Sequence, residues 1–516
     1  MRCRNLARGL QRRGAEILFM CRERSGDLNA LLSEEFAVMR LPALPGPEPC
    51  PDGLEGRDLY GAWLGCSQLQ DVGDCLNVIR TAGPGPIHCL VVDHYGLDQT
   101  WERGICDSLN KLQGEPPRLL VFDDLADRPH QSTVLVDANR IESSSWDSYR
   151  ALVPAGCRLL LGPAYAPLDP LYAQLQPLAP QRCTLRRVLV FFGGVDQANH
   201  TAVALEALAH PDLADLAVDV VLGAEAPHYA SVAQLVQQRP HTQLHGGLAS
   251  LAALILRADL AIGAAGTVSW ERAALALPTL VTPVAENQRQ GAQALAHAGA
   301  ALLNNPQQSA DPAALTFEAI KTLLEQPERL QQLSAGARSL GDGRGLGRLV
   351  TLLLGPAAGR RLRPTTLADE STYHTWANDP EVRRQSFNTD PIPLDQHQRW
   401  FRSRLQTPDA LLRVLVDQEG LPLGQIRFER SATEPDRALI GFSLDPIVRG
   451  HGLASDLLKL GVAELARHWG PVVEAYGEVR AANTASARSF QRAGFSEGLP
   501  PRQGVRCFYR LFDTAL

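Results

Sequence analysis

The sequence lacks the features of a membrane, secreted or nucleic-acid-binding protein. No apolar run reaches the roughly 20 residues that a membrane-spanning helix needs, and no signal-peptide pattern is present. Basic residues are not in excess, because 50 Lys and Arg stand against 56 Asp and Glu, which gives a formal net charge of -6. We therefore expect a cytoplasmic protein that binds neither nucleic acid nor a membrane surface.

The spacing typical of metal ligands is also missing. The ten cysteines include no Cys-x-x-Cys pair and form no compact cluster with histidine, so we expect no metal site. The plain interpretation of Cys3, Cys21, Cys89 and Cys106 is that they are buried free thiols.

At 516 residues the chain is too long for one hydrophobic core, so two or three domains are expected. In the first 350 residues, short apolar runs alternate with amphipathic segments, a pattern typical of buried parallel strands joined by crossover helices. A proline-rich stretch at residues 163–180 indicates a hinge between two such α/β lobes. The predicted strands are Ala15–Cys21, Cys89–Asp93, Leu119–Asp123, Val134–Asp137, Leu159–Gly162, Arg187–Phe192, Val218–Leu222, Leu260–Gly263 and Thr279–Pro283.

These patterns predict an α/β fold class with three domains. Two Rossmann-like lobes are expected at residues 1–165 and 186–354. Residues 354–364 contain two glycines and two prolines and are typical of a linker. An α+β domain is predicted to follow at residues 361–516.

Two motifs in the last third of the chain indicate a cofactor site. The first, Leu444–Ala454, lies between a predicted strand at Ala438–Ser443 and a predicted helix at Ser455–Trp469. Its small residues allow backbone N–H groups to approach a pyrophosphate at the start of the helix. The second, Asn483–Phe495, follows a predicted strand at Val472–Val479. The predicted cofactor contacts are Leu444, Arg449, Gly450, Gly452, Ala454, Asn483 and Ser486.

The stretch Arg449–Ala454, of the form Arg-x-x-Gly-x-Ala, and the stretch Asn483–Phe495 resemble the two signatures of the GNAT family of N-acetyltransferases. The resemblance implies acetyl-CoA as co-substrate and direct attack of an amine on the thioester, whose carbonyl a backbone N–H polarises. Family members often carry a Tyr that protonates the leaving thiolate where this chain has Phe490, which cannot do so. Water, Tyr476 or another group would have to serve, so the acid is unassigned.

Three groups of small and polar residues follow predicted strands of the second lobe. A Gly-Gly turn after a buried strand can cradle a diphosphate, and a Gly-Thr pair would begin a helix that faces phosphate. Glu271, one turn further on, could hold ribose hydroxyls. Plain turns and helix caps are the alternative at each position, but together the groups favour one ligand site. The predicted substrate contacts are Gly193, Gly194, Asp196, Gly266, Thr267, Glu271, Asn287 and Gln288.

Acidic and aromatic residues follow two predicted strands of the first lobe. One strand ends in Asp93, His94 and Tyr95, and the next ends in a turn that contains Asp124 and Asp127. Carboxylates at such positions can bind a sugar or act as bases. Helix capping and loop salt bridges are the alternative for Asp124 and Asp127, and His94 alone is no evidence of catalysis. Tyr95 is a predicted sugar contact.

The first 350 residues resemble the UDP-2,4-diacetamido-2,4,6-trideoxy-β-L-altropyranose hydrolases of pseudaminic acid biosynthesis, a pathway of flagellin glycosylation. That family is similar to the lipid II glycosyltransferase, so the resemblance implies two lobes of the glycosyltransferase-B type, with UDP held mainly by the second. It implies Asp93, Tyr95 and Asn287 as catalytic residues. The stretches that carry it are Met1–Cys3, Val92–Tyr95, Phe122–Ala126, Leu161–Tyr165, Phe192–Asp196 and Ala264–Glu271.

The GNAT-like part resembles the enzyme of the preceding step in that pathway, also in Asn378–Arg383 and in Trp400–Phe401. That enzyme acetylates the 4-amino group of a UDP-4-amino-4,6-dideoxy-N-acetyl-β-L-altrosamine. The resemblance therefore implies a bifunctional enzyme whose acetylated product is the substrate of its own hydrolase.

One departure bears on the hydrolase. In that family, a strand and a Gly-x-Gly-His turn with the presumed general base precede the stretch matching Met1–Cys3. Here Met1–Gly14 is a predicted helix and Ala15–Cys21 would be the second strand. We therefore expect acetylation of a UDP-4-amino sugar but little UDP release. Two further interpretations stay open for the two lobes: a glycosyltransferase, or a non-catalytic module that binds a UDP-sugar.

Overall fold

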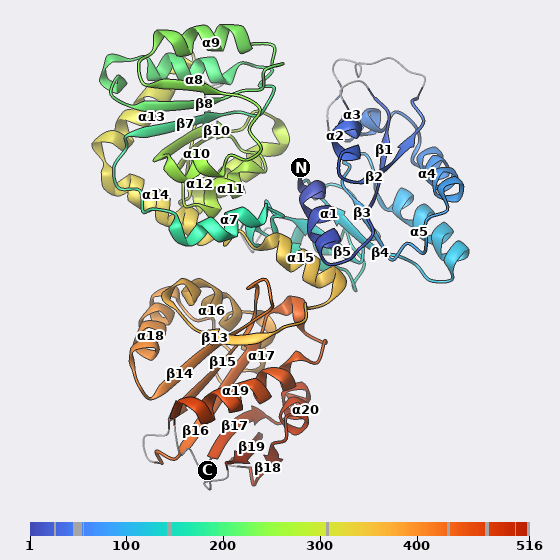
Figure 1. The fold of residues 1–516 in the computed structure, drawn as a ribbon, viewed down its shortest axis with the longest axis vertical. Helices are drawn as coiled ribbons and strands as arrows, with labels where there is room; N and C mark the ends of the chain where they lie inside the picture. Colours follow the sequence, from blue (N-terminus) through green and yellow to red (C-terminus); the bar gives the residue numbers. More distant parts are fainter. Residues whose placement is uncertain are drawn as a thin grey trace. The chain divides into compact units, whose positions relative to one another are not determined.

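The computed structural model describes residues 1–24, 27–44, 54, 56–141, 147–305, 309–430, 434–469, 474–500 and 502–512. The chain divides into two compact units, residues 1–349 and 350–516, each considered by itself below (Figure 1). The boundary falls inside helix α15 (Gly345–Leu354), near the predicted end of the second lobe. No helix in the described part of the chain is long and apolar enough to cross a membrane.

The first lobe contains a four-stranded parallel sheet of order β3-β4-β5-β6 and a separate parallel pair, β1-β2. The four strands of the larger sheet lie within one residue of their predicted bounds, whereas β1 begins three residues later than predicted and β2 is not predicted. The elements are α1 (Arg2–Arg12), β1 (Leu18–Arg22), α2 (Asn29–Ser33), β2 (Ala37–Leu41), α3 (Gly56–Leu64), α4 (Gln68–Ala82), β3 (Cys89–Val92), α5 (Gln99–Gln113), β4 (Arg118–Phe122), β5 (Val134–Asp137), α6 (Asp147–Arg150) and β6 (Arg158–Leu161).

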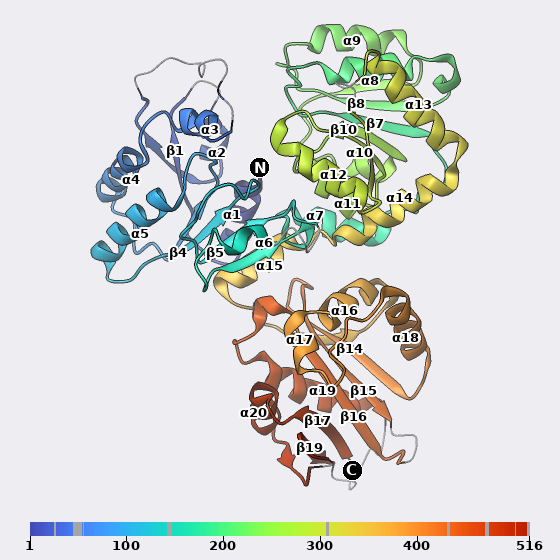
Figure 2. The same ribbon diagram turned by 180° about the vertical axis from the view of Figure 1, so that it is seen from behind.

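The second lobe is built on a six-stranded parallel sheet of order β12-β11-β10-β7-β8-β9. Both of its faces are covered by helices, as expected for continuous apolar strands (Figure 2). The predicted α/β class with Rossmann-like lobes is confirmed. The elements are β7 (Arg187–Phe191), α8 (His200–Leu208), β8 (Ala217–Val221), α9 (Tyr229–Gln238), β9 (Thr242–His245), α10 (Ala252–Arg257), β10 (Leu260–Ala264), α11 (Val268–Ala274), β11 (Thr279–Thr282), α12 (Arg289–His297), β12 (Ala301–Leu303), α13 (Pro312–Glu325) and α14 (Pro327–Leu340).

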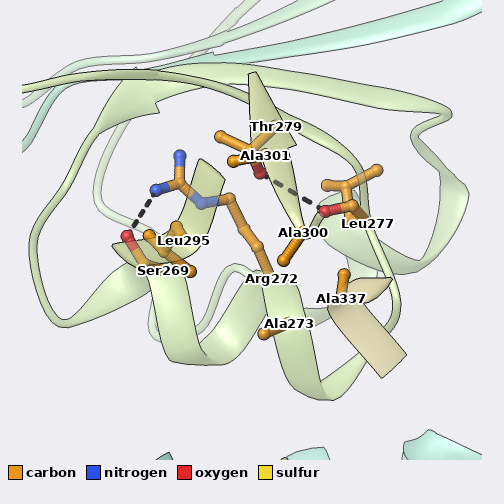
Figure 3. Close-up of a pocket in the computed structure, with 9 residues that line it drawn as sticks. All are labelled: Ser269, Arg272, Ala273, Leu277, Thr279, Leu295, Ala300, Ala301 and Ala337. Atoms are coloured by element: carbon orange, nitrogen blue, oxygen red, sulfur yellow. Dashed lines mark hydrogen bonds between the residues drawn. The ribbon is translucent and has the colours of Figure 1, made fainter. Parts of the chain in front are cut away.

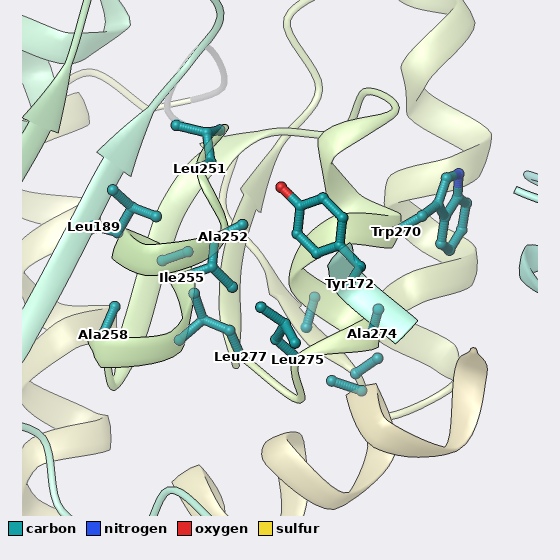
Figure 4. Close-up of a cluster of buried hydrophobic side chains, with 14 of the residues drawn as sticks. Tyr172, Leu189, Leu251, Ala252, Ile255, Ala258, Trp270, Ala274, Leu275 and Leu277 are labelled. Carbon is teal, nitrogen blue, oxygen red and sulfur yellow. The ribbon is translucent and has the colours of Figure 1, made fainter. Parts of the chain in front are cut away.

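The proline-rich stretch predicted as a hinge is largely helical and packs against the second lobe. It forms two short 3-10 helices and α7 (Pro170–Leu175), whose Tyr172 is buried among side chains of α10 and α11 (Figure 4). The buried Arg182 follows. Its guanidinium donates to backbone carbonyls near the ends of α10 and α11, among them those of Ile255 and Leu275. A buried cation that satisfies helix-end carbonyls fixes this connection to the second lobe.

The second unit is one mixed sheet of order β13-β14-β15-β16-β17-β19-β18, in which only the β16-β17 pair is parallel among the described residues. The predicted linker ends in strand β13, because its last residues pair with β14. The elements are β13 (Arg361–Pro364), α16 (Glu370–Ala377), α17 (Pro380–Gln385), α18 (Leu394–Gln406), β14 (Ala410–Val416), β15 (Pro422–Arg430), β16 (Arg437–Leu444), α19 (Leu453–Trp469), β17 (Glu474–Arg480), α20 (Thr484–Arg492), β18 (Ser496–Glu497) and β19 (Val505–Leu511).

Helices cover both faces of this sheet. Helix α19 lies close to β15, where a Cβ on Gly461 would meet the Ile426 side chain at 2.4 Å. On the other side, Phe401 of α18 packs with residues of α16 and β14. The predicted strand at Val472–Val479 is observed as β17, and its residues 472 and 473 lie outside the described residues.

Candidate functional sites

Strands β16 and β17 separate at their carboxyl ends. In the described part of the chain they pair only over Arg437–Leu439 and Glu474–Tyr476. Beyond these residues β16 continues along β15, and β17 continues along β19. Beyond this point, the facing edges of β16 and β17 have backbone groups that do not pair with each other. These edges lie next to the two motifs that the sequence indicates as a cofactor site.

The loop between β16 and α19 holds the first motif. Gly450 and Gly452 have φ values of +85° and +77°, a region that favours glycine, and no atom lies within 4 Å of the position of a Cβ on either. Leu444 precedes this loop and Ala454 lies in the first turn of α19, so the predicted residues of the first motif come together at the start of one helix.

The Arg449 side chain is turned back onto the protein. Its guanidinium donates to the carbonyl of Leu444 and lies 2.8 Å from the carboxylate of Asp379, which caps α17. The carboxylate of Asp445 also ties the loop, because it accepts a hydrogen bond of 2.9 Å from the indole of Trp376 in α16. Arg449 and Asp445 therefore fix the shape of the loop.

The second motif forms the start and the buried face of α20. The Asn483 side chain caps the helix by accepting a hydrogen bond of 3.0 Å from the backbone N–H of Ser486. Phe490 is buried against the rings of Phe442 and Phe508. Phe490 is thus a core residue at the place where the family often has a Tyr.

Tyr476 is poorly suited to act as the acid. It is the last residue of β17 that pairs with β16, and the guanidinium of Arg437 lies 4.6 Å from its ring centroid. Burial raises the pKa of Tyr476, so the phenol holds its proton more tightly than usual.

Glu478 was not predicted as a site residue. The alternation along β17 buries Ala475, Gly477 and Val479 and leaves Glu478 on the other face, beyond the point where pairing with β16 ends. Its side chain is 31% exposed, and its carboxylate lies 3.7 Å from the Arg502 guanidinium. The alternation of buried and exposed residues along β17 could have singled out Glu478, but the sequence does not show where the pairing of β17 with β16 ends.

In the first unit, a pocket of about 190 Å³ is lined by residues of both lobes. It brings together five of the predicted residues: Tyr95, Gly266, Thr267, Asn287 and Gln288. The first lobe adds Asp124, which the sequence offered as a sugar-binding carboxylate or base with helix capping as the alternative. It also adds Arg2, Phe122 and Asn139, which were not among the predicted contacts. Within each lobe, the carboxyl ends of parallel strands lie at one edge of the sheet, which brings together residues that are distant in sequence.

Asp93, predicted as catalytic, does not line this pocket in the described structure, whereas Asp124 does. The Asp93 carboxylate accepts hydrogen bonds of 2.6 and 2.9 Å from Arg2 and one from the Cys3 thiol. Burial alone would raise the pKa of Asp93, but the Arg2 guanidinium lowers it below its usual value. A carboxylate held in this way is a weak base.

The other predicted contacts lie outside the lining of this pocket among the described residues. Asp196 caps α8 by accepting hydrogen bonds of 3.1 and 2.8 Å from two backbone N–H groups. Gly193 and Gly194 form the turn after β7, where a Cβ on either would meet no atom within 4 Å. Glu271 accepts a hydrogen bond of 2.5 Å from Tyr172, and burial raises its pKa. These contacts give Asp196 and Glu271 structural roles, whether or not they also contact a substrate as predicted.

A second, smaller cavity of about 10 Å³ lies behind the pocket-lining loop (Figure 3). The buried Arg272 side chain donates to the Ala264 carbonyl at 2.6 Å and to the Ser269 hydroxyl at 3.0 Å. Burial lowers the pKa of Arg272 to about 10, so the group stays charged at neutral pH. Arg272 therefore holds both ends of the loop that carries Gly266 and Thr267.

No cluster of His, Cys, Asp and Glu able to hold a metal ion occurs among the residues that the structure describes. The first lobe instead contains a buried ionic network behind the pocket. The fully buried His130 lies 2.6 Å from the carboxylate of Glu102, and Arg128 bonds Asp123 at 2.8 Å.

We predict that His130 makes the first lobe more stable at neutral than at alkaline pH. Burial alone lowers the pKa of His130, but Asp123 and Glu102 raise it to about 9. Its stabilisation is therefore complete below the unfolded value of about 6.5 and is lost as pH rises toward 9, by roughly 3 kcal/mol. Urea unfolding at pH 6.5 and 9.5 should show a smaller loss in His130→Asn than in the wild type. The exposed His88 provides the control His88→Asn, and equal pH profiles for all three proteins would contradict the assignment.

Comparison with known proteins gives independent matches to both parts of the chain. Residues 360–496 match the family model described as an acetyltransferase (GNAT) domain. The spore coat polysaccharide biosynthesis protein SpsG of Bacillus subtilis (strain 168) is 28% identical over 205 residues, which are 40% of this chain and 60% of that protein. A solved structure of spermidine N-acetyltransferase from Vibrio cholerae, in complex with CoA and spermine, covers 30% of this chain and 96% of its own at 17% identity, with a TM-score of 0.28.

A second relative is a UDP-N-acetylglucosamine--N-acetylmuramyl-(pentapeptide) pyrophosphoryl-undecaprenol N-acetylglucosamine transferase of Methylococcus capsulatus. It is 47% identical over 89 residues, which are 16% of this chain and 24% of that protein. The chain thus spans less than two thirds of either relative. Residues 360–496 thus match a GNAT acetyltransferase domain, and the region before them is similar to a sugar biosynthesis protein.

Proposed function

We propose that the chain is a bifunctional enzyme of nucleotide-sugar metabolism. Its GNAT domain would transfer an acetyl group from acetyl-CoA to the amine of a UDP-4-amino sugar, and its two lobes would bind the acetylated product. We expect hydrolysis of that product to free sugar and UDP to be slow, because Asp93 is bonded to Arg2 and does not line the pocket of the described structure. The observation that carries the proposal is the pocket lined by Tyr95, Gly266, Thr267, Asn287 and Gln288 in a chain that also has an acetyltransferase domain.

The sugar that we propose is the 4-amino precursor of UDP-2,4-diacetamido-2,4,6-trideoxy-β-L-altropyranose, as in pseudaminic acid biosynthesis. The named functions of the two relatives, polysaccharide biosynthesis and N-acetylglucosamine transfer, support a sugar nucleotide as the ligand class. Consecutive steps on one polypeptide are chemically consistent, because the first product is the second substrate.

In the proposed acetyl transfer, the substrate amine attacks the thioester carbonyl, a C–N bond forms and the C–S bond breaks. A backbone N–H of β16 beyond Leu439 would stabilise the oxyanion. Glu478 would take the proton that the nitrogen loses, and the CoA thiolate would be protonated from water. Glu478 suits this role because it is the carboxylate on the part of β17 that no longer pairs with β16 in the described structure.

We predict that Glu478→Gln lowers kcat about 10²- to 10⁴-fold, the usual contribution of a positioned general base. The rate of CoA thiol release with a UDP-4-amino sugar measures the effect. Tyr476→Phe serves as the control and should keep most of the activity. An inactive Tyr476→Phe beside an active Glu478→Gln would reverse the assignment.

The glycine loop gives a second test. Gly452→Val should abolish acetyl-CoA binding, because a branched side chain is strained at a φ of +77° and would fill the open space over the loop. Gly420→Val is a matched control, since Gly420 has a φ of +82° and equally open surroundings in another loop of the same unit. Calorimetry should show loss of acetyl-CoA binding only in Gly452→Val. Equal affinity in both variants would exclude this loop from the site.

Glycosyl transfer is the second candidate for the two lobes, favoured by the 47% identity to a glycosyltransferase segment. We predict that release of UDP from UDP-2,4-diacetamido-2,4,6-trideoxy-β-L-altropyranose does not depend on an acceptor. The measurement is UDP formation by the full chain with and without lipid-linked N-acetylmuramyl-pentapeptide. Release only with the acceptor would favour the transferase, and binding of the UDP-sugar without release would leave the lobes as a binding module.

A further inference from the structure

The carboxylate of Asp124 joins three side chains from separate parts of the first lobe. It accepts hydrogen bonds of 2.9 Å from Arg2 in α1, 2.6 Å from the Tyr95 hydroxyl after β3, and 2.9 Å from the Asn139 amide after β5. All four residues line the pocket between the lobes. One carboxylate, whose side chain is 10% exposed, therefore orients three pocket-lining groups.

The direction of these bonds decides what the wall offers to a ligand. An ionised carboxylate only accepts hydrogen bonds, so the Tyr95 hydroxyl must donate its one proton to Asp124. Its oxygen is then left to accept. Asn139 turns its amide nitrogen to Asp124, which directs its carbonyl oxygen elsewhere. Tyr95 and Asn139 are thus left with oxygens that can accept, whereas the guanidinium of Arg2 is bonded to Asp93 and Asp124.

The charged groups around the first-lobe wall also bear on which ligand it suits. Arg2 is shared between Asp93 and Asp124, so two carboxylates surround one guanidinium. The fully buried Asp137 lies nearby, where it accepts bonds from Arg140 and Tyr149. Burial, followed by the charge of Asp124, raises the pKa of Asp137 to about 6. The guanidinium groups of Arg2 and Arg140 and the Met1 ammonium offset these carboxylates, so the wall suits a neutral group that donates hydrogen bonds.

The second-lobe wall is different. The Gln288 carbonyl oxygen accepts a hydrogen bond of 3.2 Å from the backbone of Val284, so its amide nitrogen is the group left for the pocket, on the side of Gly266. Amide N–H groups and the hydroxyl of Thr267 suit an anion or a carbonyl.

We propose that Asp124 is a positioning residue that makes the first-lobe wall a recognition surface for the hydroxyl and acetamido N–H groups of a sugar. This inference rests on the proposed binding of a UDP-sugar. Asp124 acts through Tyr95 and Asn139, two pocket-lining side chains whose donor groups it engages, so that their oxygens remain to accept. An amide at this position would offer the Tyr95 hydroxyl a donor as well as an acceptor, and the direction of the bonds would no longer be set.

Calorimetry on the full chain with UDP and with UDP-N-acetylglucosamine tests this role. The wild type should bind the UDP-sugar more tightly than UDP. Asp124→Asn should reduce that preference by roughly 5- to 100-fold, the range for the loss of two hydrogen bonds between neutral groups, and should leave the affinity for UDP unchanged. A variant that was merely less well folded would lose affinity for both ligands. Asp127→Asn is the matched control, since Asp127 pairs with Arg128 in the same loop and is not among the pocket-lining residues of the described structure.

The outcomes distinguish a failure of the proposed function from a failure of the role of Asp124. A wild type that does not bind UDP overturns the proposed function, and this inference with it. UDP binding with an unchanged sugar preference in Asp124→Asn, or an equal loss in Asp127→Asn, overturns the role of Asp124 alone. If Asp124→Asn does not fold, Tyr95→Phe removes one of the acceptor atoms and should lower the same preference, and an unchanged preference there overturns the inference.

Discussion

The ion pairs of Arg2 are the interaction on which the first-lobe pocket depends. Strands β3 and β4 are parallel, so their carboxyl ends bring Asp93 and Asp124 to one edge of the sheet. Two carboxylates so close are stable only because the Arg2 guanidinium lies between them, with its face over the ring of Phe122. These carboxylates raise the pKa of Arg2 although burial opposes the shift. Helix α1 is thereby fixed to the sheet edge at which the pocket forms.

The second lobe uses buried arginines in a different way. Arg182 and Arg239 donate to backbone carbonyls instead of carboxylates, and Arg272 donates to a carbonyl and a hydroxyl. Burial lowers the pKa of all three. Carbonyls at helix and strand ends supply the partial negative charge that these cations need. The result is a rigid lobe whose loops after β10 and β11 can present uncharged donors to a ligand.

Much of the fold could be predicted from sequence because most strands of the two lobes are buried on both faces. Such strands appear as continuous apolar runs, which is why β3 to β6 lie within one residue of prediction. Strands β2, β9 and β12 were missed because they lie at sheet edges, where side chains are partly exposed and the apolar runs are short or interrupted. Strand β13 was taken as linker because its four residues include three polar or proline positions and are defined only by pairing with β14.

The candidate sites divide in the same way. Glycines such as Gly452 can be read from sequence because a backbone conformation requires them there. The choice between Asp93 and Asp124 cannot, because both follow buried strands and only tertiary structure shows which one lines the pocket. Glu271 and Asp196 have structural partners that the sequence did not reveal. Glu271 accepts a hydrogen bond from Tyr172, which is distant in the chain, and Asp196 caps a helix.

The central claim is that the acetyl acceptor is a nucleotide-linked amino sugar. The most direct measurement is mass spectrometry of the products after the full chain is incubated with acetyl-CoA and UDP-4-amino-4,6-dideoxy-N-acetyl-β-L-altrosamine, with spermidine as a competing amine. The account predicts one new acetyl group on the nucleotide sugar, at its 4-amino nitrogen, and equimolar CoA. Acetylation of spermidine alone, with the nucleotide sugar recovered unchanged, would contradict it.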